Sequence, residues 1–257
     1  MSRPELPPDS ATPAALLDVT VVLPYFNPGA ALRTTVEETV TALRQTGASF
    51  EVIGVSDGST DGSERSIEAL FPEDLVHILL PGHRGKGEAL RTGFRSGRGR
   101  YIGFIDADGD IPPSTLKSFV EIAHSSGPDI VIGSKRHPGS RVVYPRLRRL
   151  YSWTYQQLVR AAFGLRVTDS QVGIKLVRRE VLADVLPRTV VEGFAFDLEL
   201  LVLAQHLGYS NLVEAPIEVL HRFSSTVSPV AVLKTLLDTA WVWWRLHVTH
   251  RYGPMGG

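Results

Sequence analysis

The chain has 257 residues, with 27 Lys and Arg, 27 Asp and Glu, and no Cys, so its formal net charge is zero. The lack of Cys excludes a disulfide framework, a thiol nucleophile and a thiolate metal site. Zero net charge argues against nucleic-acid binding through bulk positive charge. The length suits one large domain or two small ones, and no repeat or clear linker divides the chain.

The chain opens with a proline-rich segment that carries four Pro between Met1 and Pro13. Since Pro interrupts helices, we expect residues 1–17 to form a disordered lead. This segment lacks the apolar stretch of a signal peptide, and no run of about 18 apolar residues marks a transmembrane helix. We therefore expect a cytoplasmic protein with a main domain over 18–228 and a separate C-terminal segment over 229–257.

The first half of the chain alternates short apolar runs with amphipathic stretches. The pattern predicts strands over 19–24, 50–56, 75–80, 101–105 and 129–133, and helices over 29–46, 63–70, 86–96 and 113–124. Such alternation predicts an α/β fold with a mostly parallel sheet and helices on both faces. Because ligands bind at the carboxyl ends of such strands, the loops after the first four strands are the candidate site.

The second half is less regular. We expect helices over 146–163, 196–207 and 229–250, and strands over 173–177 and 211–220. The last helix carries three of the four Trp together with apolar residues at helical spacing: Val230, Leu233, Leu236, Leu237, Trp241, Trp244 and Val248. This pattern suits an amphipathic helix at a membrane interface, and a helix in the core or at a dimer contact is the alternative.

The acidic run Asp106-Ala107-Asp108-Gly109-Asp110 directly follows a predicted buried strand. Three carboxylates at alternate positions repel one another unless a cation lies between them. Oxygen ligands without nearby His or Cys suit Mg²⁺ or Mn²⁺, which complete their shell with substrate phosphates. A solvated acidic turn is the alternative interpretation.

Three other loops favour anionic ligands. Asp57 ends the second strand, where its carboxylate can accept a hydrogen bond from a ribose hydroxyl or a base. Lys86 lies among glycines at a predicted helix start, which is a candidate anion site but not a P-loop. Residues 135–149 carry six Lys or Arg and no carboxylate, and Arg suits planar recognition of phosphate. Each loop is also compatible with an ordinary turn, helix cap or solvated face.

Together these residues resemble the family 2 glycosyltransferases, which have the Rossmann-like GT-A fold, over about residues 19–220. The resemblance begins with Val21–Asn27, Ser56–Ser59 and Asp106–Asp108. Narrower likeness to the dolichyl-phosphate β-glucosyltransferase branch, and more distantly to dolichyl-phosphate mannose synthases, is carried by residues 85–90, 133–136, 169–175 and 193–200. The branch implies inverting, metal-dependent transfer of a hexose from a nucleotide sugar to a polyprenyl phosphate at a membrane surface, without nucleic acid.

The resemblance implies roles for individual residues. Those expected to bind the donor are Pro24, Tyr25, Asn27, Asp57, Lys86 and Asp106. Those expected to hold Mg²⁺ or Mn²⁺ are Asp106, Asp108 and Asp110. Those matching the acceptor-phosphate positions are Arg136, Arg148 and Ser152, and Asp108, Arg136 and Lys175 are expected to be catalytic, with Lys175 facing the phosphates.

Two departures concern the donor, for which UDP-glucose is favoured and other UDP-sugars or GDP-mannose remain open. Ser56 stands where Asp is common, and Asn27-Pro28 where Asn-Glu is common. A third departure, Val172 in place of a common Cys, predicts only a packing change. Three alternative functions are a glycosyltransferase with a soluble phosphorylated acceptor, a nucleotide-sugar-binding regulatory module and a nucleotidyltransferase. The last should carry a Gly-rich basic loop after the first strand, where Pro24–Asn27 stands instead.

Overall fold

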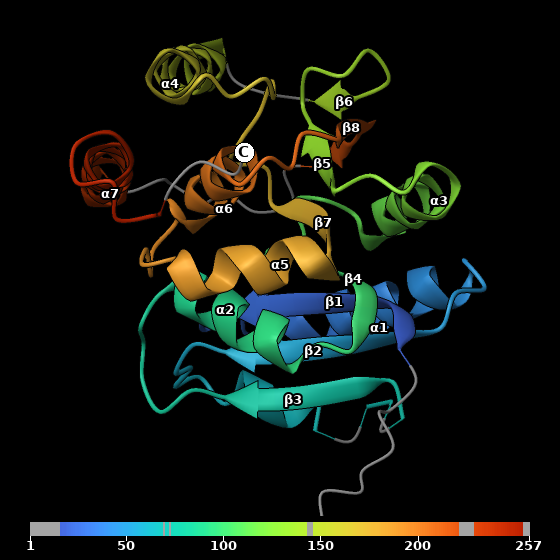
Figure 1. Cartoon of the computed structure of the whole chain (residues 1–257). Helices are drawn as coiled ribbons and strands as arrows, with labels where there is room; N and C mark the ends of the chain where they lie inside the picture. Colours follow the sequence, from blue (N-terminus) through green and yellow to red (C-terminus); the bar gives the residue numbers. More distant parts are fainter. Residues whose placement is uncertain (1–15, 69, 72, 143–145, 221–228, 254–257) are drawn as a thin grey trace, which may run out of the picture.

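A computed structural model describes residues 16–68, 70–71, 73–142, 146–220 and 229–253, without the side chains of 146–152, 229 and 231. A seven-stranded sheet runs through the middle of the molecule (Figure 1). Its strands, in spatial order, are β3 (Leu75–Leu79), β2 (Phe50–Ser56), β1 (Leu17–Tyr25), β4 (Gly99–Ile105), β7 (Ile174–Arg178), β5 (Ile130–Ser134) and β8 (Leu212–Pro216). The short strands β6 (Arg141–Val142) and β9 (Glu218–Val219) pair separately.

The direction of the strands brings most loops of interest to one edge of the sheet. β1 pairs in parallel with β2 and β4, and β5 pairs in parallel with β8. β7 runs antiparallel between β4 and β5, with Phe104 opposite Lys175. The carboxyl ends of β1, β2, β4 and β5 therefore share an edge with the beginning of β7, which is the edge where ligands bind in such sheets.

Helices cover both faces of the sheet, and each face has its own apolar core. One core includes residues of α1 (Ala31–Arg44) and α3 (Leu116–Ser126). The other includes residues of α2 (Lys86–Ser96), α4 (Arg146–Phe163), α5 (Arg179–Val185), α6 (Phe196–His206) and α7 (Pro229–His247). Three short 3₁₀ turns lie at Ser63–Ser66, Pro113–Thr115 and Leu186–Arg188.

The helices α4 and α7 both lie next to α6, with α4 above it and α7 beside it in the view of Figure 1. The hydroxyl groups of Tyr155 in α4 and Thr239 in α7 are 2.9 Å apart, and Val242 of α7 is buried in the core. No helix among the described residues is both long enough and apolar enough to cross a bilayer.

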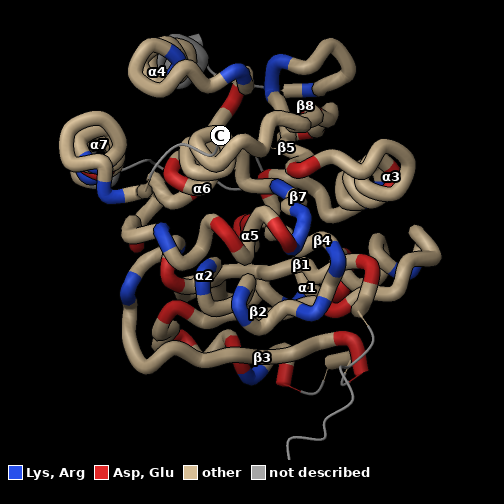
Figure 2. The backbone as a smooth tube through the Cα atoms, viewed as in Figure 1, with Lys and Arg blue, Asp and Glu red and all other residues tan. Residues whose placement is uncertain are grey.

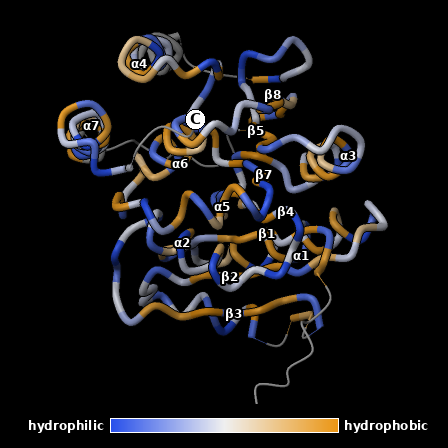
Figure 3. Tube along the Cα trace, in the orientation of Figure 1, coloured by the Kyte–Doolittle hydropathy of each residue, from blue (hydrophilic) through white to orange (hydrophobic). Residues whose placement is uncertain are grey.

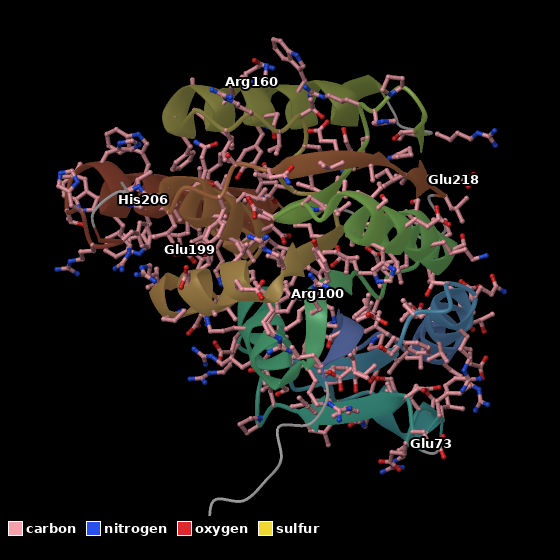
Figure 4. All side chains as sticks on the ribbon, turned by 45° about the vertical axis from the view of Figure 1, so that its right-hand side comes forward. Glu73, Arg100, Arg160, Glu199, His206 and Glu218 are labelled. Carbon is pink, nitrogen blue, oxygen red and sulfur yellow. The ribbon has the colours of Figure 1, made fainter. Side chains whose placement is uncertain are left out.

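A buried carboxylate fixes the chain just before α6. Glu199 accepts hydrogen bonds from the amides of Val190 and Val191 and from the hydroxyl group of Tyr252. Figure 4 labels Glu199 within the molecule, whereas Arg160 lies on the outer side of α4. These bonds hold the 190–194 segment against α6, and this segment reaches the candidate site described below.

The α/β fold and its mostly parallel sheet are confirmed, with several local differences. In place of the helix predicted over 63–70, the structure has a 3₁₀ turn at Ser63–Ser66. Gly62, directly before this turn, has a left-handed backbone (φ 73°). The strand predicted over 211–220 is divided into β8 and β9, which pair with different partners. Helix α5 was not expected from the sequence. The reversed direction of β7 was not expected either, because the apolar pattern of a strand is the same in both directions.

Candidate active site

A cavity of about 600 Å³ opens at the carboxyl edge of the sheet. The loops after β1, β2 and β4, the beginning of α2 and the segment before α6 form its wall. Its lining residues are Pro24, Tyr25, Phe26, Asn27, Pro28, Ala31, Asp57, His83, Lys86, Ala89, Asp106, Ala107, Asp108 and Phe194. Seven of the residues assigned from the sequence thus lie around one space: Pro24, Tyr25, Asn27, Asp57, Lys86, Asp106 and Asp108.

Side chains fasten the loop after β1 to the loop after β2. Asn27 has a left-handed backbone (φ 48°), and its side-chain oxygen accepts a hydrogen bond from the Thr60 amide at 2.7 Å. The Asn27 amide donates to the Ser59 hydroxyl group at 3.0 Å, and the Gly29 amide donates to Asp61 at 2.8 Å. These bonds make one continuous rim from two loops that are about 30 residues apart.

Asp57 holds the loop that leads into α2. Its two carboxylate oxygens accept hydrogen bonds from the amides of Arg84 at 2.8 Å and Gly85 at 2.9 Å. One of them also lies 2.8 Å from Nδ1 of His83. Asp57 lines the cavity, but protein groups already occupy both of its carboxylate oxygens. Its main contribution is to hold the loop that positions Lys86.

Two aromatic rings stand at the mouth of the cavity. The rings of Phe26 and His83 lie 4.1 Å apart between centroids and are tilted by 32°. Phe26 is 46% exposed, although it is a large apolar residue. An exposed aromatic face beside a polar rim is suited to stacking on a nucleoside base.

Tyr25 turns away from this mouth. Its ring is buried, and its hydroxyl group is hydrogen bonded to Nε2 of His77 on β3. Burial raises the pKa of the Tyr25 hydroxyl above its usual value, and the same effect lowers the pKa of His77. Tyr25 thus presents ring atoms to the cavity and uses its polar end inside the sheet.

Four charged side chains form an alternating row beneath the cavity. Lys86 Nζ lies 2.7 Å from Asp106 Oδ1 and 3.3 Å from Asp197 Oδ2. Asp197 Oδ1 lies 3.4 Å from Nζ of Lys175, which also donates to the carbonyl oxygen of Val172 at 2.7 Å. The exposed fraction of these side chains falls from 30% for Asp106 to 0% for Lys175. The row therefore runs from the cavity wall into the core.

Burial and charge act against each other in this row. Burial raises the pKa of Asp106 above its usual value, although the charge of neighbouring Lys86 opposes this shift. Burial also disfavours the charged form of Lys86, but Asp106 and Asp197 outweigh it and hold the pKa of Lys86 above its usual value. Burial lowers the pKa of Lys175, with Asp197 opposing the shift. Asp197 is thus the shared counterion of two buried ammonium groups.

The structure places Lys175 differently from the sequence-based expectation of a residue facing the phosphates. Its side chain has no exposed surface and does not line the cavity. Direct contact with a donor or acceptor phosphate is therefore not available in this conformation. Lys175 instead holds Asp197 and the chain at Val172, because the antiparallel β7 brings it beside Phe104 under the cavity.

Two glycines allow the close approaches on which this arrangement depends. A Cβ atom at Gly173 would lie 2.1 Å from Asp106 Oδ2, so only glycine lets the carboxylate rest on this backbone. A Cβ atom at Gly85 (φ 111°) would lie 2.5 Å from the carbonyl oxygen of Glu192. The motifs around Lys86, Lys175 and Asp197 thus meet around Asp106 although the sequence separates them widely.

The acidic loop offers oxygen ligands but no assembled metal cluster. Among the described residues, no group of three or more His, Cys, Asp or Glu is placed to hold a metal ion. Asp106 is paired with Lys86. Asp108 lines the cavity and accepts a hydrogen bond from the Asp110 amide at 3.0 Å. Asp110 Oδ1 is buried without a hydrogen-bond partner. An orphaned carboxylate oxygen beside Asp108 fits a Mg²⁺ or Mn²⁺ ion that completes its shell with donor phosphates.

Of the three residues assigned to the acceptor phosphate, only Arg136 has a described side chain, and it is not among the residues that line the cavity. Arg136 is exposed in the loop after β5, where its amide donates to the Ser134 hydroxyl group at 3.2 Å. Arg148 and Ser152 lie in the first turns of α4, and their side chains are outside the described residues.

Sequence reasoning missed two site residues that come from the 193–200 motif. Phe194 lines the cavity and is 56% exposed, and Asp197 forms the ion pairs described above. A signal for Asp197 was present, since a carboxylate flanked by Phe196 and Leu198 in an apolar helix needs a buried partner. Nothing in the sequence pattern distinguishes Phe194 from a core residue.

The sequence matches known proteins over most of its length. The profile described as Glycosyl transferase family 2 matches residues 20–186. Glycosyltransferase AglD of Haloferax volcanii is 30% identical over 98% of this chain and 41% of its own length. The dolichyl-phosphate beta-glucosyltransferase of Dictyostelium discoideum is 28% identical over 77% of this chain and 65% of its own length. The chain therefore spans less than two thirds of either relative.

A solved structure shares the fold. Glucosyl-3-phosphoglycerate synthase from Mycobacterium tuberculosis, in complex with uridine diphosphate, superimposes with a TM-score of 0.68. The match covers 93% of this chain and 81% of that one at 20% sequence identity. This likeness shows that the GT-A arrangement of strands and helices is present here.

Proposed function

The chain belongs to glycosyl transferase family 2, and from that premise we propose that it transfers a hexose from a nucleotide sugar to a polyprenyl phosphate. Glucose is the first candidate, in line with the dolichyl-phosphate relative. The observation that carries the proposal is the cavity itself. It joins an aromatic mouth to a charged floor with Lys86, Asp106 and Asp108.

The proposed reaction needs charge compensation more than proton transfer. A phosphate oxygen of the acceptor is anionic at neutral pH, so it attacks the anomeric carbon without a general base. The bond to the nucleoside diphosphate breaks as the new bond forms on the opposite face, which inverts the anomeric centre. We assign Lys86, which lines the cavity, to the leaving diphosphate, and positioning of the two anions would supply much of the rate enhancement.

The acidic loop would hold a divalent cation for this step. Asp108 and Asp110, with Asp106, are the residues we assign to Mg²⁺ or Mn²⁺, which neutralises charge on a diphosphate when bound. Asp106 is paired with Lys86 in the protein alone. Binding of the cation and the donor would therefore require Asp106 to share its carboxylate between Lys86 and the new ligands.

We assign the acceptor phosphate to Arg136, with Arg148 and Ser152, and expect Arg136→Ala to raise KM for polyprenyl phosphate. Arg136 is exposed after β5, at the same edge as the cavity, and an Arg contact with phosphate is a strong, charge-assisted one. Loss of such a bond costs about 1.5–3 kcal/mol, which corresponds to roughly a 10- to 100-fold rise in KM. Initial rates with each substrate varied in turn would check this, and a rise in KM for the nucleotide sugar alone would contradict the assignment.

The helix α7 is the surface we assign to the membrane. Figure 2 draws it mostly in the colour of uncharged residues, and Figure 3 shows hydrophobic residues along it. All seven apolar residues singled out in the sequence are exposed: Val230, Leu233, Leu236, Leu237, Trp241, Trp244 and Val248. Such a face on a helix that does not span the bilayer is typical of interfacial binding, here to the cytoplasmic leaflet.

We expect the double variant Leu233→Gln and Leu237→Gln to bind anionic lipid vesicles at least about tenfold more weakly, because burying one Leu is worth about 1.5–3 kcal/mol. These side chains are 58% and 61% exposed, so the fold should tolerate the change. A matched control is Val76→Gln with Leu79→Gln on the edge strand β3, where the two side chains are 42% and 58% exposed. Vesicle sedimentation would measure binding, and equal losses in both double variants would argue against a membrane role specific to α7.

A panel of donors tests the proposed function. The protein would be incubated with Mn²⁺ or Mg²⁺, undecaprenyl phosphate and, separately, UDP-glucose, UDP-galactose, UDP-N-acetylglucosamine and GDP-mannose. We expect a glycolipid that extracts into organic solvent with one of these donors, UDP-glucose first. No extractable product from any donor would contradict the proposal.

A further inference from the structure

We propose that Phe194 and the neighbouring Lys234 of α7 form the route by which the polyprenyl phosphate enters the donor cavity, with Phe194 contacting the first isoprene units. This inference rests on the proposed function and adds to it a residue that selects the acceptor. Neither residue was assigned a role from the sequence. Three observations carry the inference: the exposure of Phe194, the contact of its loop with α7, and the chemistry of the α7 face beside it.

Phe194 belongs to the cavity and to the protein surface at once. It lines the cavity together with Lys86 and Asp106, yet 56% of its surface is exposed. The segment that carries it is fixed, because the Gly87 amide donates to the Glu192 carbonyl oxygen at 2.7 Å and Glu199 holds Val191. Exposing the apolar ring of Phe194 to water is unfavourable, and contact with an apolar ligand would remove that surface from water.

The loop touches α7 at the residue before Phe194. A Cβ atom at Gly193 would lie 3.1 Å from Asp238 Oδ2 and 3.7 Å from Lys234 Cε. Glycine therefore permits a close contact between the cavity wall and the middle of α7. The apolar surface of α7 and the cavity are consequently neighbours, with the 193–194 loop as their boundary.

The face of α7 at this boundary suits an amphiphile with an anionic head. Val230, Leu237 and Trp241 are four, three and seven residues from Lys234, so they share its side of the helix. Their exposed fractions are 75%, 61% and 48%. Lys234 lies one helical turn from Asp238, and burial raises the pKa of that carboxyl, with the Lys234 charge opposing the shift. Lys234 thus brings a positive charge among apolar side chains, with Asp238 as its neighbour on the helix, and a phosphate attached to a prenyl chain needs both kinds of contact.

The part of the cavity wall formed by the loops after β1 and β2 has different chemistry from the segment before α6 that carries Phe194. There the rings of Phe26 and His83 lie 4.1 Å apart and tilted, near the hydrogen-bonded Asn27, a setting that suits a flat, polar base. Lys86 and Asp106 line the same cavity as both Phe side chains. We therefore assign the donor base to Phe26 and the acceptor chain to Phe194.

The two aromatic residues allow a crossed test in the full-length chain. Phe194→Ala and Phe26→Ala remove the same side chain from two different segments of the cavity wall, and both positions are exposed enough for the variants to fold. Uridine diphosphate binding by calorimetry would show whether the donor site of Phe194→Ala is intact. KM for UDP-glucose, or for whichever donor the panel identifies, and for two acceptors, citronellyl phosphate and undecaprenyl phosphate, would then be measured for each variant.

We expect Phe194→Ala to raise KM for both acceptors about tenfold, with less than a twofold change in KM for the donor, and Phe194→Leu to recover most of the loss. Phe26→Ala should show the reverse pattern. An unchanged acceptor KM in Phe194→Ala, or an equal rise for donor and acceptor, would overturn the inference while the proposed function stands. Failure of the wild-type protein to form any glycolipid would overturn both.

Discussion

Replacing Asp108 with Asn is expected to reduce turnover at least about 10³-fold, because a metal-held diphosphate contributes several kcal/mol to stabilising the transition state. Asp108 lines the cavity next to Asp110, whose buried Oδ1 has no hydrogen-bond partner. An amide retains the size of the side chain and can still accept the hydrogen bond of the Asp110 amide. The fold should therefore be kept while the affinity for the cation is lost.

Two measurements separate this effect from a folding defect. Thermal unfolding of Asp108→Asn should match the wild-type curve, and Mn²⁺ binding in the presence of uridine diphosphate, followed by electron paramagnetic resonance, should weaken. Asp184→Asn is a matched control, since this exposed carboxylate on α5 accepts a hydrogen bond from Tyr209 and lies outside the cavity lining. If Asp108→Asn had the turnover of the wild-type protein, the assignment of Asp108 as a metal ligand would be wrong.

The second large effect concerns stability. Asp197→Ala is expected to lower the free energy of unfolding by about 3–5 kcal/mol, the usual cost of removing one partner of a buried ion pair. The variant leaves Lys175 wholly buried without its carboxylate, and Lys86 retains only Asp106. For a chain of this length the loss corresponds to roughly a 10 °C fall in Tm, which calorimetry would detect.

A double variant tests the cause of this loss. Asp197→Leu together with Lys175→Met removes both charges of the inner pair and leaves apolar side chains in their place. Replacement of a buried pair by apolar residues is often neutral or stabilising, so the double variant should recover most of the lost Tm. A double variant as unstable as Asp197→Ala would show that the carboxylate matters for packing rather than as a counterion.

The sheet and most helices follow from local patterns in the sequence. The apolar run at 50–56 coincides with β2, which is buried on both faces, and the amphipathic stretch at 86–96 coincides with α2, whose period follows from burial on one side. The position of β7 does not follow, since the order β4-β7-β5 depends on pairing with β4 about 70 residues earlier and with β5 about 45 residues earlier. That reversed strand is the reason why Lys175 lies beneath the cavity rather than on its wall.

The site was predictable where strand ends carry unusual side chains, as at Asp57, Asp106 and Asp108. The partners of those side chains were not predictable. Asp57 accepts hydrogen bonds from the amides of Arg84 and Gly85. Because every residue except Pro has a backbone amide, the sequence does not show which amides it binds. The close approach of Gly173 to Asp106 is likewise a consequence of folding that a lone glycine in a motif does not reveal.

The proposed acceptor is a lipid phosphate, and a competition between a lipid and a soluble acceptor would test this proposal. Equimolar undecaprenyl phosphate in vesicles and 3-phosphoglycerate in solution would be offered with radiolabelled UDP-glucose, or the donor that the panel identifies, and Mn²⁺, with Asp108→Asn as the blank. We expect the label to enter the organic phase as a glycolipid. Label transferred to 3-phosphoglycerate, with none in the organic phase, would contradict it.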